Sequence, residues 1–97
     1  MATYLSFIKY TQKGAENIRQ SPGRLDAARE VFQRLGVELK AFYLTMGRYD
    51  IVTVVEAPDD ATAAKALLAV ASGGSISTET VRAFPEQEYR QIIAELP

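Results

Sequence analysis

The chain has 97 residues, 47% of them hydrophobic, which suffices for one buried core but not for two. Its 11 basic and 12 acidic side chains give a formal charge of −1 with no run of like charge, which argues against a surface for nucleic acid or anionic lipid. The sequence contains no cysteine and no histidine, which excludes disulfides, thiolate nucleophiles and histidine-based catalysis, and no metal site is expected.

The N-terminal segment carries no targeting signal. Residues 1–10 alternate in polarity and lack a basic stretch followed by an apolar one, and no apolar run approaches the length of a membrane span. We therefore expect a soluble, cytoplasmic protein that forms one domain over residues 1–97 and does not enter a membrane.

A strand and a broken helix open the chain. Residues 4–10 have strand propensity throughout, with apolar side chains on both faces. Thr11 suits the cap of a following helical turn, and Ser21-Pro22 suits a second N-cap with proline at the first helical position. Helix is predicted from residue 11 to 35 with an interruption near Ser21. Its second part has an apolar stripe that packs on a sheet: Leu25, Ala28, Val31, Phe32 and Leu35.

The stretch from Leu39 to Asp60 predicts a β-hairpin. Residues 37–45 and 51–56 are rich in β-branched and aromatic residues, and a short turn around Gly47 separates them. Gly47 provides the positive φ that a tight turn requires. Because the second of these strands shows almost no polar alternation, we expect it to lie in the middle of a sheet, covered on both faces.

A helix, a strand and a final helix complete the predicted elements. Asp59 and Asp60 supply a turn and a carboxylate ahead of an alanine-rich helix over residues 61–71. Residues 76–84 predict a fourth strand. Pro85 begins a last helix whose apolar stripe needs a docking site: Tyr89, Ile92, Ile93 and Leu96.

The predicted order of elements indicates an α+β, ferredoxin-like βαββαβ fold with a four-stranded antiparallel sheet and an extra C-terminal helix. Right-handed crossovers place the first and third strands in the middle and both helices on one face. The other face would expose more apolar surface than soluble monomers tolerate. We therefore expect self-association through this open sheet face, as a two-fold homodimer or a higher homo-oligomer.

The chain resembles the small bacterial and archaeal proteins of the GYD family, named after a glycine, any residue, tyrosine, aspartate signature that stands here as Gly47-Arg48-Tyr49-Asp50. The likeness runs nearly end to end and includes the segments SPGRLDAA, STETVRAF and EYRQIIAELP. It implies a ferredoxin-like fold of the dimeric α/β-barrel type, without an established activity and without a catalytic residue to carry over. Haem is bound by some barrels of this kind, but the missing histidine disfavours that role here.

Tyr49 and Asp50 are the first candidates for a ligand pocket, because they stand where the hairpin turn enters a central strand. Their phenol and carboxylate can bind a ligand or take a proton. In the structural alternative, which we favour, Asp50 bonds turn amides and Tyr49 packs over the end of the sheet.

A second group of candidates consists of polar strand residues. Thr78 and Arg82 face one way on the last strand with Thr80, and together with Tyr43, Thr45 and Thr53 they can line a polar pocket between two packed sheets. The alternative is a set of cross-strand hydroxyl pairs, with Arg82 paired to Glu79 or Glu56.

Lys9 and Arg24 form the third group, since both can point a cation at an anionic ligand near the start of the main helix. In the alternative, which is the commoner situation, both are simply solvated.

Two functions remain open on the sequence. The first is a non-catalytic oligomeric domain that binds a small molecule or another protein. The second is a cofactor-independent enzyme, monooxygenase-like or isomerase-like, that uses Asp50 or a glutamate as base and Tyr43 or Tyr49 as acid in a buried cleft. Neither the catalytic residues, the ligand nor a cofactor can be named from the sequence.

Overall fold

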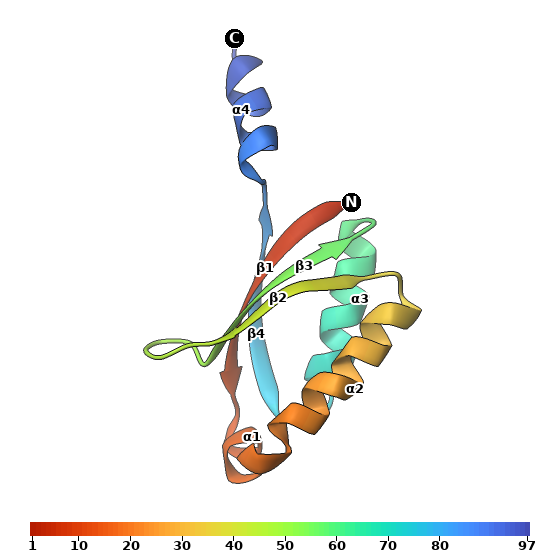
Figure 1. Cartoon of the computed structure of the whole chain (residues 1–97), viewed down its shortest axis with the longest axis vertical. Coiled ribbons are helices and arrows are strands. Elements are labelled where there is room, and N and C mark those ends of the chain that lie inside the picture. Colours follow the sequence, from red (N-terminus) through yellow and green to blue (C-terminus); the bar gives the residue numbers. More distant parts are fainter.

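The computed structural model describes residues 1–97 and has the predicted order of elements (Figure 1). The elements are β1 (Ala2–Tyr10), α1 (Gln12–Glu16), a single 3₁₀ turn η1 (Ile18–Gln20), α2 (Ser21–Arg34), β2 (Glu38–Leu44), β3 (Ile51–Ala57), α3 (Asp60–Ala71), β4 (Ile76–Ala83) and α4 (Glu86–Ala94). No helix combines the length and the mean hydropathy that crossing a bilayer requires.

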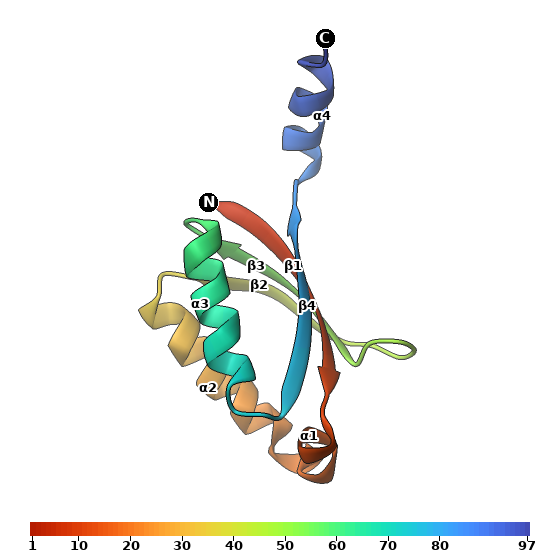
Figure 2. The ribbon, with the colours of Figure 1, turned by 180° about the vertical axis from the view of Figure 1, so that it is seen from behind.

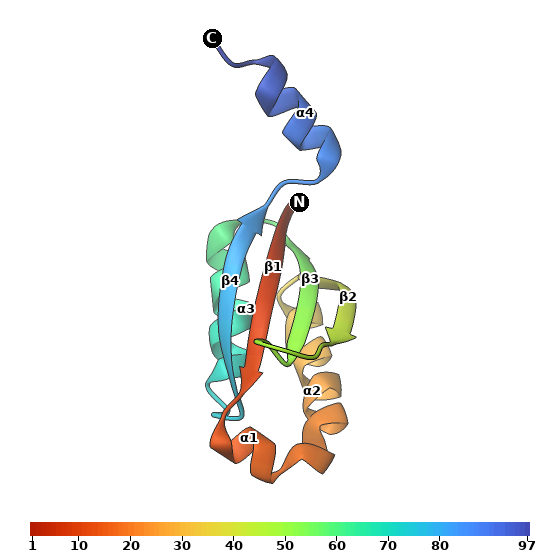
Figure 3. The ribbon, with the colours of Figure 1, turned by 90° about the vertical axis from the view of Figure 1, so that its left-hand side faces the viewer.

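The sheet has the order β2-β3-β1-β4, and every neighbouring pair is antiparallel. The first and third strands are therefore central, as the crossover rule predicts. Both α2 and α3 lie behind the sheet in Figure 3, and the face toward the viewer carries no helix. This is the ferredoxin-like α+β arrangement, with α4 as the extra C-terminal helix.

Strand alternation divides the side chains between the two faces. Tyr4, Ser6 and Ile8 of β1 point to the helices and are buried, whereas Leu5 and Phe7 point the other way and are half-buried. We call the side without helices the open face. Its side chains, read from the pairing register, are Thr3, Leu5, Phe7, Lys9, Glu38, Ala41, Tyr43, Val52, Val54, Glu56, Ser77, Glu79, Val81 and Ala83.

The core lies between the sheet and the helices. Tyr4 and Val55 pair across the two central strands and pack with Phe32 of α2 and with Ala63 and Ala66 of α3. The short alanine side chains let α3 approach the strands closely. Only 13 of the 97 residues are buried, so this well-packed region is small and much of the space under the helices lies outside it.

The helix starts agree with the sequence at Thr11 and differ at Ser21. Thr11 caps α1, with its hydroxyl accepting a hydrogen bond from the Gly14 N–H at 3.2 Å. The predicted cap at Ser21 is wrong, because Ser21 has helical φ and ψ and is already inside α2. Its hydroxyl instead shares a hydrogen bond of 2.9 Å with the Tyr10 hydroxyl.

Helix α4 projects from the body of the molecule. It follows β4 and extends beyond the sheet in all three ribbon views (Figures 1, 2 and 3). None of its residues is buried, and its apolar stripe of Tyr89, Ile92, Ile93 and Leu96 is exposed. The predicted docking site for this stripe is therefore not found within the chain.

Asp59 caps α3 and makes the stability of this helix depend on pH. Its carboxylate accepts a hydrogen bond of 2.8 Å from the Thr62 N–H, which lowers the pKa of the Asp59 carboxyl from its ordinary value of 3.8. A lowered folded-state pKa contributes stability above the unfolded-state pKa, and this contribution is lost as the pH falls through the folded value.

The amide oxygen that Asp59→Asn introduces retains the cap but does not titrate. We therefore expect the melting temperature of Asp59→Asn to fall by less than that of the wild type when the pH is lowered from neutral to acidic. Asp59→Ala should lower the melting temperature at neutral pH by more than Asp59→Asn does. Thermal melts between about pH 2 and pH 7 measure both effects. If the melting temperatures of the wild type and of Asp59→Asn changed equally with pH across that range, the assigned role of the carboxylate would be contradicted.

Candidate functional site

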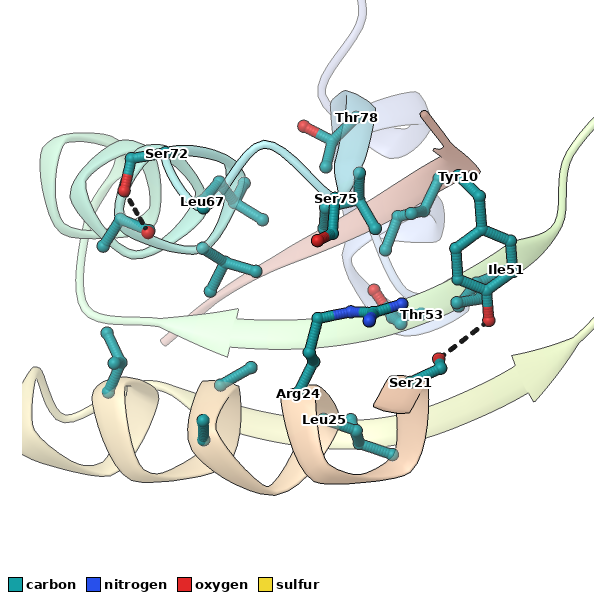
Figure 4. A pocket seen from close by; sticks show the side chains of 18 of the residues that line it. Tyr10, Ser21, Arg24, Leu25, Ile51, Thr53, Leu67, Ser72, Ser75 and Thr78 are labelled. Carbon is teal, nitrogen blue, oxygen red and sulfur yellow. Dashed lines mark hydrogen bonds between the residues drawn. The ribbon is translucent and has the colours of Figure 1, made fainter. Parts of the chain in front are cut away.

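An open cavity of about 510 Å³ lies between the sheet and the two main helices. Figure 4 shows it bounded by α2, α3 and the strands, with the sheet forming one wall. Most of the lining is apolar and comes from all three sides, including Ile8, Ile51, Ile76, Leu25, Val31 and Leu67. The cavity is within the size range of small-molecule sites.

A small set of polar groups lines the same cavity. Thr53, Thr78 and Ser75 contribute hydroxyls, and Arg24 and Lys13 are the only charged residues in the lining. Lys13 is exposed and donates to the Gly73 carbonyl at 2.9 Å. No aspartate or glutamate takes part in the lining.

Among these polar groups, Arg24 reaches from α2 toward the sheet. Its side chain is half-buried and extends into the space between the helix and the sheet (Figure 4). The guanidinium donates to the Asn17 carbonyl at 3.0 Å and to the Gly14 carbonyl at 3.4 Å. Gly14 lies in α1 and Asn17 directly follows this helix, so the early end of α1 determines where the guanidinium points.

A second polar cluster gathers around Tyr49 on the open face. The Tyr49 ring packs on Phe7 with 5.2 Å between ring centroids, and the cations of Lys9 and Arg48 each lie 5.6 Å from the Tyr49 centroid. The Tyr49 hydroxyl donates to the Glu79 carboxylate at 2.7 Å. This hydrogen bond raises the pKa of the Tyr49 phenol, since the phenolate would lose it and face a carboxylate.

Asp50 holds the end of β1. Its carboxylate accepts a hydrogen bond from the Tyr10 N–H at 2.9 Å, and its own N–H donates to the Ile8 carbonyl at 2.9 Å. The Thr45 N–H donates to the Asp50 carbonyl at 2.8 Å, which closes the hairpin loop. Asp50 thus fastens the loop to the neighbouring central strand. Its carboxylate bonds an amide of β1 and not an amide of the hairpin turn, which differs from the structural alternative for this residue.

The polar strand residues do not form one group. Thr53 and Thr78 face the helices and line the cavity, whereas Tyr43 pairs with Val52 on the open face. The predicted pocket that combines all of them between two sheets is wrong, because Tyr43 and Thr53 point to opposite sides of the sheet.

Arg82 also differs from its predicted partnership with Glu79 or Glu56. Its guanidinium donates to the backbone carbonyls of Thr3 and Ala83, and it lies 4.5 Å from the Phe84 ring centroid and 5.7 Å from that of Tyr4. Arg82 faces the same side of the sheet as Thr78 but does not line the cavity.

Lys9 and Arg24 are likewise separated. Lys9 is exposed on the open face beside Tyr49, whereas Arg24 lies on the helix side. The prediction that both point at one ligand is therefore wrong, because the sheet stands between them.

Sequence reasoning missed Ser75 and Tyr10 in the cavity and Glu79 as the partner of Tyr49. Tyr10 carries a signal that the sequence does contain, since strand alternation places it on the same face as Ile8. The enzyme alternative required a carboxylate inside a cavity. It is not supported, because the cavity lining contains none.

These features define a ferredoxin-like α+β domain with a cavity on its helix side and an unpartnered sheet face. The chain belongs to the GYD domain family, whose family model matches residues 4–93. The resemblance drawn from Gly47-Arg48-Tyr49-Asp50 and the flanking segments is thereby confirmed.

One curated relative is similar along most of its length. The chain is 41% identical over 86 residues to the glutamine synthetase and cystathionine beta-lyase binding protein of Thermus thermophilus, and the match covers 88% of this chain and 90% of that protein.

Two solved structures are similar at low sequence identity. One is TTHA0845 from Thermus thermophilus, with a TM-score of 0.56, 23% identity, and coverage of 88% of this chain and 95% of that chain. The other is the leucine response regulatory protein of Mycobacterium tuberculosis, with a TM-score of 0.57, 13% identity, and coverage of 87% of this chain and 51% of that chain. The chain thus spans about half the length of that regulator, and both likenesses concern the fold alone.

Proposed function

We propose that the protein is a non-catalytic binding domain that attaches to metabolic enzymes and that functions as a homo-oligomer. The Thermus thermophilus relative supports the class of partner, because its name describes binding to glutamine synthetase and to cystathionine β-lyase. The structural observation that carries the proposal is the apolar stripe of α4, which projects from the body with nothing from its own chain against it.

Helix α4 has the form of a helix that enters a groove on a partner. Its apolar residues Tyr89, Ile92 and Ile93 fall on one side at helical spacing, while Gln87 and Gln91 fall on the other. An exposed stripe of this kind contributes binding energy when a partner removes it from water, at about 25 cal/mol per Å² of apolar area.

The open face supports the oligomer. Leu5, Val54 and Val81 lie side by side in its apolar part, and the Tyr49 cluster described above adds both charge signs at one end. A patch that carries a cation and an anion side by side can be complementary to its own copy across a two-fold axis.

We expect immobilised protein to bind purified glutamine synthetase or cystathionine β-lyase in biolayer interferometry, and Ile92→Asp/Ile93→Asp to weaken that binding at least tenfold. A tenfold loss corresponds to about 1.4 kcal/mol, which a charge placed in an apolar contact readily exceeds. Gln91→Asp adds a charge to the opposite side of α4 and serves as the matched control.

Undiminished binding by Ile92→Asp/Ile93→Asp would remove α4 from the interface. Absence of binding to either enzyme by the wild type would contradict the proposed function itself.

A further inference from the structure

The helix-side cavity combines apolar walls with a single well-held cation. Its lining comes mainly from aliphatic and aromatic side chains, and the only two charged residues in it are basic. Lys13 is exposed at the rim and already donates to Gly73, which leaves Arg24 as the charge that faces the interior.

Arg24 carries a charge that nothing in the chain neutralises. The side-chain ion pairs of the structure are Lys40–Glu38 and Arg90–Glu86, so Arg24 has no carboxylate partner. Its two protein partners are neutral backbone carbonyls at 3.0 and 3.4 Å, which occupy two of its five N–H donors. Half-buried charges usually have a counter-charge, since burial without one is costly.

The rest of the cavity has the properties of a site for an apolar group. Its lining includes Tyr10 and Ile51 on one side of Arg24 and Leu67 of α3 on the other (Figure 4). The volume of about 510 Å³ contrasts with the small buried core, so a ligand there would complete the packing between helices and sheet. The hydroxyls of Thr53 and Thr78 lie on the sheet wall and add only neutral polarity.

We propose that this cavity binds an apolar monocarboxylate, with the carboxylate on the Arg24 guanidinium and the hydrocarbon body between α2, α3 and the sheet. A guanidinium offers the planar pair of donors that a carboxylate accepts in bidentate fashion. The absence of any acidic residue from the lining removes the repulsion that an anion would otherwise meet. The inference is independent of the proposed binding to enzymes.

The test uses octanoate, decanoate and dodecanoate below their micelle concentrations, with decanol as a probe of matched length without the charge. Isothermal titration calorimetry on the full chain should show saturable binding of decanoate and at least tenfold weaker binding of decanol. In ¹⁵N-HSQC spectra, decanoate should shift amides around Arg24, Thr53 and Thr78.

Three variants distinguish the contribution of the Arg24 charge from that of the cavity volume. Arg24→Gln retains a donor for the neighbouring carbonyls and should bind decanoate no better than decanol. Arg29→Gln removes an exposed arginine from the same helix, outside the cavity, and should bind like the wild type. Ala28→Phe fills part of the cavity and should weaken both probes.

Equal affinity of Arg24→Gln and Arg29→Gln for decanoate would overturn the assignment of the carboxylate to Arg24. Amide shifts confined to the open face or α4, or no saturable binding at any chain length, would overturn the site. Undiminished decanoate binding by Ala28→Phe would do so as well.

Discussion

Replacing Gly14 with alanine is expected to lower the free energy of unfolding by about 1 to 3 kcal/mol, the usual cost of forcing extra volume into a packed site. A Cβ at residue 14 would lie 2.0 Å from the backbone oxygen of Ser75. Neither side of that contact can retreat cheaply. The Ser75 carbonyl accepts the Thr11 N–H at 3.0 Å, and the Thr11 hydroxyl donates to the Gly74 carbonyl at 2.6 Å.

Gly23→Ala provides the matched control, because it adds the same methyl group to α2 where nothing lies within 4 Å. It should leave stability unchanged or raise it by up to about 1 kcal/mol through better helix propensity. Urea unfolding followed by circular dichroism compares the two variants. Equal stability of Gly14→Ala and Gly23→Ala would show that α1 does not pack closely on the segment before β4.

Replacing Val54 with aspartate is expected to convert the proposed homo-oligomer into monomers. Val54 lies in the middle of the open face, paired with Leu5 on β1 and Ala41 on β2. Packing two sheets over an unpaired carboxylate leaves a buried charge, at a cost of about 3 to 5 kcal/mol. That corresponds to a subunit dissociation constant raised by roughly two to four orders of magnitude.

Sedimentation velocity over a range of concentrations measures this change. Leu68→Asp is the control, since Leu68 is 70% exposed on α3, away from the open face, and its substitution should not alter assembly. A wild-type protein that sediments as a monomer at every concentration would contradict self-association. An undissociated Val54→Asp variant would place the interface elsewhere.

The elements and their order could be predicted because their signals are local. Thr11 and Asp59 cap the helices that follow them. Gly47 has the predicted positive φ, but the predicted tight turn is wrong, because a longer loop over residues 45–50 connects β2 to β3. The sheet order then follows from general rules of chain crossover. The error at Ser21 has a non-local cause, since the Tyr10 hydroxyl on a neighbouring strand bonds its side chain.

The candidate site could be predicted only in part. Alternation shows which residues of a strand share a side, but not which side faces the helices. The prediction placed Thr53 and Thr78 between two packed sheets, whereas both face the helices. The face of Tyr43 depends on the pairing of Leu44 with Ile51, which is set by the loop bonded through Thr45 and Asp50. Such loop contacts leave no periodic signal in a sequence. The position of Arg24 likewise depends on carbonyls in and directly after α1.

One edge of the sheet, β2, is interrupted by a bulge. Leu39 pairs with Val55 and Ala41 with Val54, so Lys40 is an extra residue on an outer strand and is exposed to solvent. An interrupted edge that carries a lysine is a poor template for strand addition from another molecule. β4 pairs regularly with β1 along eight residues and leaves its other edge uninterrupted. Endless stacking by strand addition needs two competent edges, so edge-to-edge growth of the native fold stops at two molecules joined along β4.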